Sequence, residues 1–164
     1  MSHLFRTRAL GALVDEYERA IGELITLLST VSDSAFEVLR DRETADDDCR
    51  SIRTVVAHVL RSGYGYADMI RSALGVSSGR PQPKLGSRIA SIQDLPGLIS
   101  YTEDSLRDRW DMTDEEMAAI RIPARWGPTY DLEQLIEHAI VHVLRHRRQI
   151  ERFLSEAQFR VAGA

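Results

Sequence analysis

The sequence predicts an all-α protein, a four-helix bundle, and three observations lead to this fold class. Apolar residues recur every three or four positions over four long stretches, the spacing that places them on one face of a helix. No stretch alternates apolar and polar residues as a half-buried strand would. The chain has 164 residues, of which 43% are hydrophobic and 28% charged, and this suits one domain with a real core. We therefore expect residues 1–164 to form a single helical domain.

The first two helices follow from apolar spacing and from capping signals. The first is expected over residues 6–29, where the apolar positions are Leu10, Leu13, Tyr17, Ala20, Ile21, Leu24 and Leu28. The polar stretch 30–50 is interpreted as a loop, and its acidic run as solvated. The second helix begins behind Ser51, a favourable N-cap residue, and ends near Gly75.

A long connection separates the second and third helices. Residues 75–91 are rich in Gly, Ser and Pro, and their number suits a crossover along the bundle better than a tight hairpin. The second and third helices should then run parallel, which gives up-down-down-up order. The third helix is expected from Ile92 or Asp94 to Trp110, with Pro96 in its first turns, where a missing N–H is tolerated.

The segment before the last helix contains turn signals. Thr113 and Glu116 have the spacing of a capping box that opens a short helix. Pro123 and Pro128 bracket an irregular turn, in which Trp126 and Tyr130 are interpreted mainly as packing residues. The last helix should start near Asp131.

Composition excludes several classes of partner. The formal net charge is −4, from 21 basic and 25 acidic residues, and no basic stripe with interleaved aromatic residues is present, so we expect no nucleic-acid partner. No apolar run approaches roughly 18 residues, and residues 1–10 lack a signal peptide's apolar core, so we expect no membrane span. The single Cys49 cannot form an internal disulfide, which favours a cytoplasmic location. Aspartates precede Cys49 and oppose a thiolate, so it is interpreted as a bystander.

Three of the five histidines, His138, His142 and His146, stand four residues apart in the predicted last helix. Four residues advance a helix by little more than one turn, so the three rings project from one side. Two histidines at this spacing form the pair with which one helix binds a metal ion. The alternative is a run of solvated or core-edge histidines.

A helical wheel separates the three histidines. The apolar residues fall within an arc of roughly 100°, and they are Leu132, Leu135, Ile136, Ala139, Val143, Ile150, Phe153 and Leu154. His146 lies inside this arc, His142 lies at its edge beside Gln149, and His138 lies further out. A buried imidazole needs partners for both nitrogens, and a shared cation meets this need for two adjacent rings. His142 and His146 are therefore the predicted ligands, whereas His138 and Gln149 are expected to flank or orient them.

A third ligand is expected from the second helix. His58 projects at the margin of that helix's apolar stripe, and the small residues Ser62 and Gly65 on the same side leave room for a pocket. Three neutral imidazoles leave a divalent ion with open positions, as in catalytic rather than structural zinc sites. Zinc, nickel, iron and manganese all accept this ligand set, and we rank zinc and nickel first.

These segments resemble the DinB-like family of four-helix-bundle metalloproteins. The similar segments are 51–59 (SIRTVVAHV), 126–130 (WGPTY), 135–139 (LIEHA) and 142–150 (HVLRHRRQI). The resemblance implies a divalent metal held by one histidine of the second helix and a pair from the fourth. In the family the second histidine of the pair precedes x-x-Gln-Ile, which selects His142 and His146 here, with His58 as the third ligand. Relatives include mycothiol-dependent maleylpyruvate isomerases and bacillithiol transferases.

The resemblance thus implies an enzyme that uses a low-molecular-weight thiol, of the S-transferase or isomerase type. Two alternatives stay open: a non-catalytic metal- or ligand-binding stress-response protein, and an interaction bundle with purely structural histidines. Ile140, Val141 and Leu144 lie outside the apolar arc of the last helix, on a side that is otherwise charged. They suggest a homodimer through this face, because two-fold pairs are the commonest soluble assemblies.

Overall fold

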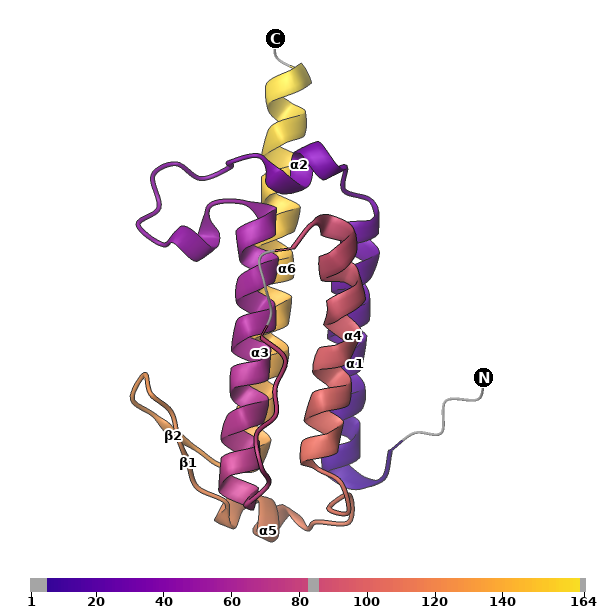
Figure 1. Cartoon of the computed structure of the whole chain (residues 1–164), viewed down its shortest axis with the longest axis vertical. Helices are drawn as coiled ribbons and strands as arrows, with labels where there is room; N and C mark the ends of the chain where they lie inside the picture. Colours follow the sequence, from indigo (N-terminus) through magenta and orange to yellow (C-terminus); the bar gives the residue numbers. More distant parts are fainter. Residues whose placement is uncertain (1–5, 83–85, 163–164) are drawn as a thin grey trace.

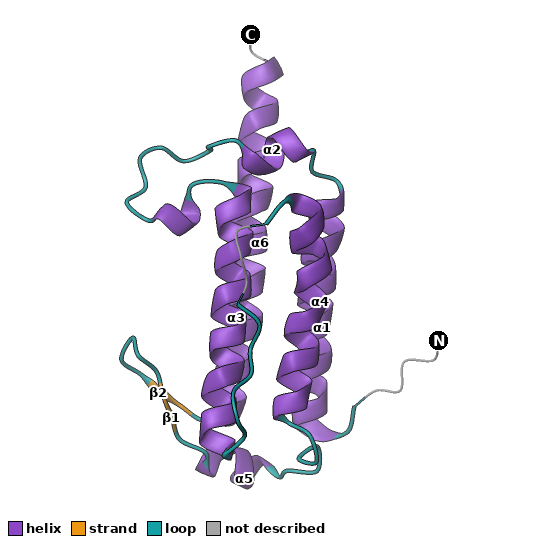
Figure 2. Cartoon of the chain, viewed as in Figure 1, coloured by secondary structure: helices purple, strands orange, loops and turns teal. Residues whose placement is uncertain are grey.

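Four long helices lie side by side in the computed structural model, which describes residues 6–82 and 86–162 (Figure 1). They are α1 (Arg8–Ser29), α3 (Ile52–Leu74), α4 (Arg88–Ser105) and α6 (Leu132–Ala162). The shorter elements are α2 (Asp33–Glu37), the 3-10 turn η1 (Asp47–Cys49), α5 (Asp114–Ala119), β1 (Ile122–Pro123) and β2 (Thr129–Tyr130) (Figure 2). The fold is all-α apart from this one small hairpin, in which β1 and β2 pair antiparallel.

The second and third long helices run parallel, as the length of the connection predicted. The rings of Tyr64 on α3 and Tyr101 on α4 lie 5.4 Å apart, and further along both helices Arg71 forms an ion pair with Asp104 over 2.7 Å. Residue numbers therefore rise together along the two helices, which means that α3 and α4 are parallel. Residues 75–82 of the connection run back along the bundle, and α1 and α6 point the opposite way from α3 and α4 (Figure 1). The order is up-down-down-up.

Helix α3 begins and ends where its sequence signals lie. The Ser51 hydroxyl accepts a hydrogen bond from the Thr54 amide, and the Thr54 hydroxyl accepts one from the Ser51 amide, so both residues form a reciprocal cap. At the other end Gly75 adopts φ +69°, a left-handed conformation that glycine reaches without strain. The helix that carries His58 is thus fixed at both ends.

Helix α4 differs from the expectation. It starts at Arg88, behind a cap in which the Ser87 hydroxyl accepts from the Ala90 amide, and it ends at Ser105 rather than Trp110. Pro96 therefore lies in the middle of the helix, and the prediction that it occupies the first turns was wrong. The predicted start overlooked Ser87, whose cap adds the first turn.

The segments that precede α3 and α6 contain more secondary structure than expected. The stretch 30–50 contains α2 and η1. Its second half, residues 40–50, is closed by a hydrogen bond from the Arg40 amide to the Arg50 carbonyl over 2.8 Å. The predicted irregular turn at 123–128 is the loop of the hairpin. It is closed by a hydrogen bond from the Ala124 amide to the Pro128 carbonyl over 2.9 Å.

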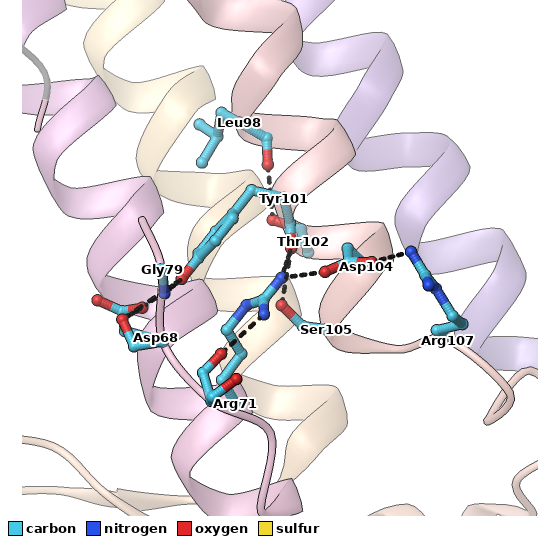
Figure 3. Close-up of polar contacts among 11 residues, drawn as sticks. Asp68, Arg71, Gly79, Leu98, Tyr101, Thr102, Asp104, Ser105 and Arg107 are labelled. Carbon is cyan, nitrogen blue, oxygen red and sulfur yellow. Dashed lines mark hydrogen bonds and ion pairs between the residues drawn. The ribbon is translucent and has the colours of Figure 1, made fainter. Parts of the chain in front are cut away.

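A buried arginine fastens the crossover segment (residues 75–82) to α3 and α4. The Arg71 side chain is almost fully buried and donates to the Ser77 carbonyl over 3.0 Å and to the Tyr101 carbonyl over 3.1 Å (Figure 3). The Tyr101 hydroxyl donates to Asp68 over 2.8 Å and accepts from the Gly79 amide over 3.2 Å. These bonds hold the crossover segment against the bundle.

One core lies between the long helices, and the predicted stripe of α6 faces it. Seven of the eight predicted residues are buried, namely Leu132, Leu135, Ile136, Ala139, Val143, Ile150 and Phe153. The eighth, Leu154, is partly buried and packs against the core. Of the three aliphatic residues outside the arc, Ile140 and Leu144 are partly buried and pack against the core, whereas Val141 is 58% exposed. Within residues 6–82 and 86–162, no helix combines the length and apolar composition needed to span a membrane.

Candidate metal centre

Helices α3 and α6 bring three histidines to one point. Each of His58, His142 and His146 offers a ring nitrogen, and the three nitrogens lie within 4.8 Å of one another. Nε2 of His58 and Nε2 of His142 are 3.0 Å apart. The ring centroid of His146 lies 4.5 Å from that of His142 and 4.9 Å from that of His58. The predicted ligands are thus neighbours in space, although 84 positions separate the first two in the sequence.

The spacing of these nitrogens fits a shared ion. Two nitrogens bound tetrahedrally to one zinc ion at about 2.0–2.1 Å lie about 3.3 Å apart. The 3.0 Å between His58 and His142 is close to this separation. The three side chains can therefore hold a metal ion after small adjustments of the rings.

Asp48 orients His58. Its Oδ2 atom lies 3.0 Å from Nδ1 of His58 and also accepts a hydrogen bond from Arg61. Burial alone would raise the pKa of the Asp48 carboxyl, but the hydrogen bonds from Arg61 and His58 lower it, so the group is ionised and only accepts. Nδ1 of His58 must then carry the proton, which leaves the Nε2 lone pair directed toward His142. Carboxylates hold metal-binding histidines in this way.

Gln149 orients His146 in the same manner. Its Oε1 atom accepts a hydrogen bond from Nδ1 of His146 over 2.9 Å, which leaves Nε2 of that ring as the free lone pair. The Cys49 thiol points at the same amide oxygen, with Sγ 3.9 Å from Oε1. Burial raises the pKa of this thiol, and Asp46 and Asp48 add to the effect, while the Gln149 contact opposes it. Cys49 is thus a neutral neighbour of the site.

Burial keeps two of the rings neutral. The His146 side chain lies inside the core stripe, and the residue is only 6% exposed. Burial lowers the pKa of His142 to about 3, and repulsion from His146 and His58 contributes to this. Burial also lowers the pKa of His146, although its bond to Gln149 acts in the opposite direction. Neutral imidazole is the form that binds a metal, so both rings are ready to bind at neutral pH.

His138 belongs to an aromatic cluster next to the three histidines. Its ring stacks on Trp126 with centroids 5.6 Å apart, and its Nδ1 lies 3.4 Å from the Tyr130 hydroxyl. Tyr66 of α3 meets both His138 and His142 edge-on, at 5.2 and 5.5 Å. His138 is therefore a flanking residue, as the wheel predicted. Trp126 and Tyr130 contact the cluster instead of only packing against the bundle.

A cavity opens beside His58 and His142. Its volume is about 730 Å³, and the small residues Ser62 and Gly65 lie in its wall, as predicted from their positions beside His58. Tyr66 and Trp126 provide the aromatic part of the wall. Burial raises the pKa of Tyr66 to about 12, so its phenol stays protonated. A second cavity of about 700 Å³ lies on the His146 side, next to Cys49 and Gln149.

Two details of the predicted site need correction. Gln149 contacts His146 and not His142, because the three-residue step from 146 to 149 places the amide over the ring one turn earlier. The acidic run was interpreted as a solvated loop, but Asp48 lies against His58 and Arg61. A carboxylate ten positions before the histidine is a weak signal in a sequence, because only the fold of residues 38–50 brings it close.

Neither a comparison with models of known protein families nor a comparison with curated proteins gives a match to this chain. The fold and the histidine cluster therefore provide the grounds for a functional assignment.

Proposed function

We propose that the chain is a DinB-like metalloprotein in which His58, His142 and His146 bind one divalent transition metal, and that it is an enzyme acting with a low-molecular-weight thiol. The observation that carries this proposal is the convergence of three imidazole nitrogens within 4.8 Å beside a cavity. Zinc and nickel are the first candidates, and iron and manganese also accept imidazole ligands.

The ligand count supports a catalytic rather than a structural centre. In the part of the chain that the structure describes, no cysteine or carboxylate joins the three histidines as a fourth ligand. Structural zinc sites are closed by four protein ligands, whereas catalytic sites keep a position open for water or substrate. The cavity beside His58 and His142 gives a small molecule access to such a position.

The residues of the chain have distinct roles in this proposal. Asp48 and Gln149 hold the rings of His58 and His146 in the tautomers that direct Nε2 inward. Tyr66 excludes water from one side of His142 and presents a protonated phenol. A divalent ion held there would make a thiolate available at neutral pH, because it lowers the pKa of a coordinated thiol. Two reaction classes fit. In the first, the thiolate forms a bond to an electrophilic carbon, which releases its leaving group; in the second, the thiolate adds to a double bond and is eliminated again after isomerisation.

Metal content followed by turnover tests the proposal. The protein is purified without an immobilised-nickel step, and bound transition metals are measured per chain. Small thiols with electrophiles are then assayed with the loaded protein. About one metal per chain together with turnover supports the proposal. Stoichiometric metal without turnover for any thiol would favour the non-catalytic metal-binding protein, and absence of metal would overturn the metal centre itself.

A further inference from the structure

The charged side chains in the wall of the His58 cavity are mostly arginines. Arg80, Arg121 and Arg125 line it, and the only acidic residue among the described lining residues is Asp68. With histidines counted as neutral in both cases, the lining side chains carry 3 − 1 = +2 charges, whereas the whole chain carries −4. A positive cavity in an acidic protein attracts anions.

Arg80 reaches the cavity from the crossover segment. Its Nε atom lies 3.4 Å from Oδ2 of Asp68. The other oxygen of this carboxylate, Oδ1, accepts hydrogen bonds from the hydroxyls of Ser78 and Tyr101, both over 2.8 Å. Figure 3 shows the Tyr101 hydroxyl directed at both Asp68 and Gly79 of the crossover segment. On the α3 side, Nη1 of Arg80 lies 3.8 Å from the position that a Cβ atom at Gly65 would occupy. The guanidinium is therefore held at one side of the cavity by Asp68, whose carboxylate is itself fixed by hydroxyls from the crossover segment and from α4.

Arg121 and Arg125 reach the cavity from the β1–β2 hairpin. Arg121 directly precedes β1, and Arg125 lies in the turn between β1 and β2. Both residues are exposed and both line the cavity, whereas Ile122 and Ala124 are buried. Neither arginine forms an ion pair within residues 6–82 and 86–162. Two guanidinium groups without carboxylate partners thus border the same cavity.

We infer that this cavity binds a small organic anion, whose carboxylate is held by Arg80, Arg121 and Arg125 while its reacting end lies at the histidines. A guanidinium is planar and offers paired N–H donors that match a carboxylate. The aromatic wall of Tyr66 and Trp126 accommodates the apolar part of the molecule. The inference rests on the proposed function, and it names the substrate class as a thiol or electrophile that carries a carboxylate.

A matched pair of thiols tests the charge preference. Cobalt(II)-loaded protein is titrated with 3-mercaptopropionate and with its uncharged amide, and thiolate binding is followed by the cobalt absorption spectrum. In parallel, the metal-free Trp110→Phe variant is titrated with both compounds, and the fluorescence of the remaining Trp126 is followed. We expect the acid to bind about tenfold more tightly than the amide in both titrations at low salt.

Two double variants locate the binding charge. Arg121→Gln with Arg125→Gln should remove most of the preference for the acid. Arg148→Gln with Arg152→Gln changes the net charge equally at exposed positions of α6 that line the second cavity, and it should leave the preference intact. Both residue pairs are on the surface, so their replacement does not unfold the core. Loss of the preference in the second variant alone would overturn the inference, because the anion would then bind on the other side.

The remaining outcomes separate the inference from the proposed function. Equal binding of acid and amide in both titrations overturns the anion site, while a cobalt–thiolate spectrum in the same experiment leaves the proposed function standing. A preference for the acid in the fluorescence titration, without any change in the cobalt spectrum, confirms the anion site and contradicts thiol binding at the metal.

Discussion

The carboxylate of Asp48 lies 3.0 Å from Nδ1 of His58, although the two residues belong to different elements, η1 and α3. This contact sets the tautomer of a proposed metal ligand from outside the bundle. Removing the charge while keeping the shape should therefore weaken metal binding. We expect Asp48→Asn to lower the metal affinity about 10- to 100-fold, as measured by competition with a chromophoric chelator.

The neighbouring Asp47 provides the control for this experiment. Its carboxylate pairs with Arg50 on the surface and does not contact His58. Asp47→Asn should keep the wild-type metal affinity. If the two variants lose the same affinity, the effect comes from the charge of the loop and not from orientation of His58.

The metal-free protein should lose stability as the pH falls through the range in which histidine titrates. Burial lowers the pKa of His142 to about 3, whereas the ring titrates near 6.5 in the unfolded chain. Between these values the unfolded state binds a proton that the folded state does not, so the free energy of unfolding decreases with falling pH. His146 acts in the same direction.

Urea unfolding of the metal-free protein at pH 7.5 and pH 5 measures this effect. The wild type should be less stable at pH 5, and His142→Gln should show a smaller decrease because it lacks one of the titrating rings. A decrease of the same size in both proteins would show that the ring of His142 is already protonated in the folded state or that other groups dominate.

The contacts of Arg71 should stabilise the fold. Its side chain is 5% exposed and bonds to two carbonyls and to Asp104. We expect Arg71→Met to lower the free energy of unfolding by about 2 kcal/mol, because the buried acceptors lose a charged donor. Arg107 pairs with the same Asp104 but is 74% exposed, so Arg107→Met should cost less than about 0.5 kcal/mol. Equal costs in urea unfolding would contradict a special role for the buried guanidinium.

Dimerisation through α6 stays a prediction, and fewer exposed apolar residues support it than the sequence suggested. Only Val141 of the three aliphatic residues is well exposed, because Ile140 and Leu144 already pack against the core. Val141→Glu is therefore the sharper variant, since a charge at position 144 would also disturb the fold. We expect a dimer at micromolar concentration in sedimentation experiments and a monomer for Val141→Glu. A monomeric wild type would exclude this interface.

The bundle and its histidines could be predicted because both depend on helical periodicity. The apolar arc of α6 places His146 in the core and His142 at its edge, and burial in the structure follows that order. The length of the crossover was enough to predict parallel α3 and α4. These inferences need only local geometry, which a sequence carries directly.

The parts that were missed depend on segments without periodicity. Asp48 reaches His58 only because backbone bonds between Arg40, Asp41 and Arg50 turn the loop back toward α3. The arginines of the hairpin have no pattern that separates them from other surface residues until β1 and β2 pair. The first turn of α4 was missed because the prediction relied on apolar spacing. The helix instead starts at the cap formed by Ser87.

The central claim is that His58, His142 and His146 hold one metal ion, and X-ray absorption spectroscopy of the metal-loaded protein tests it most directly. We predict about one metal per chain, with three imidazole nitrogens at roughly 2.0–2.1 Å from the ion. In His142→Ala and His146→Ala, stoichiometric binding should be lost, whereas His138→Ala should retain most of it. A spectrum without imidazole ligands, or equal loss of metal in all three variants, would contradict the claim.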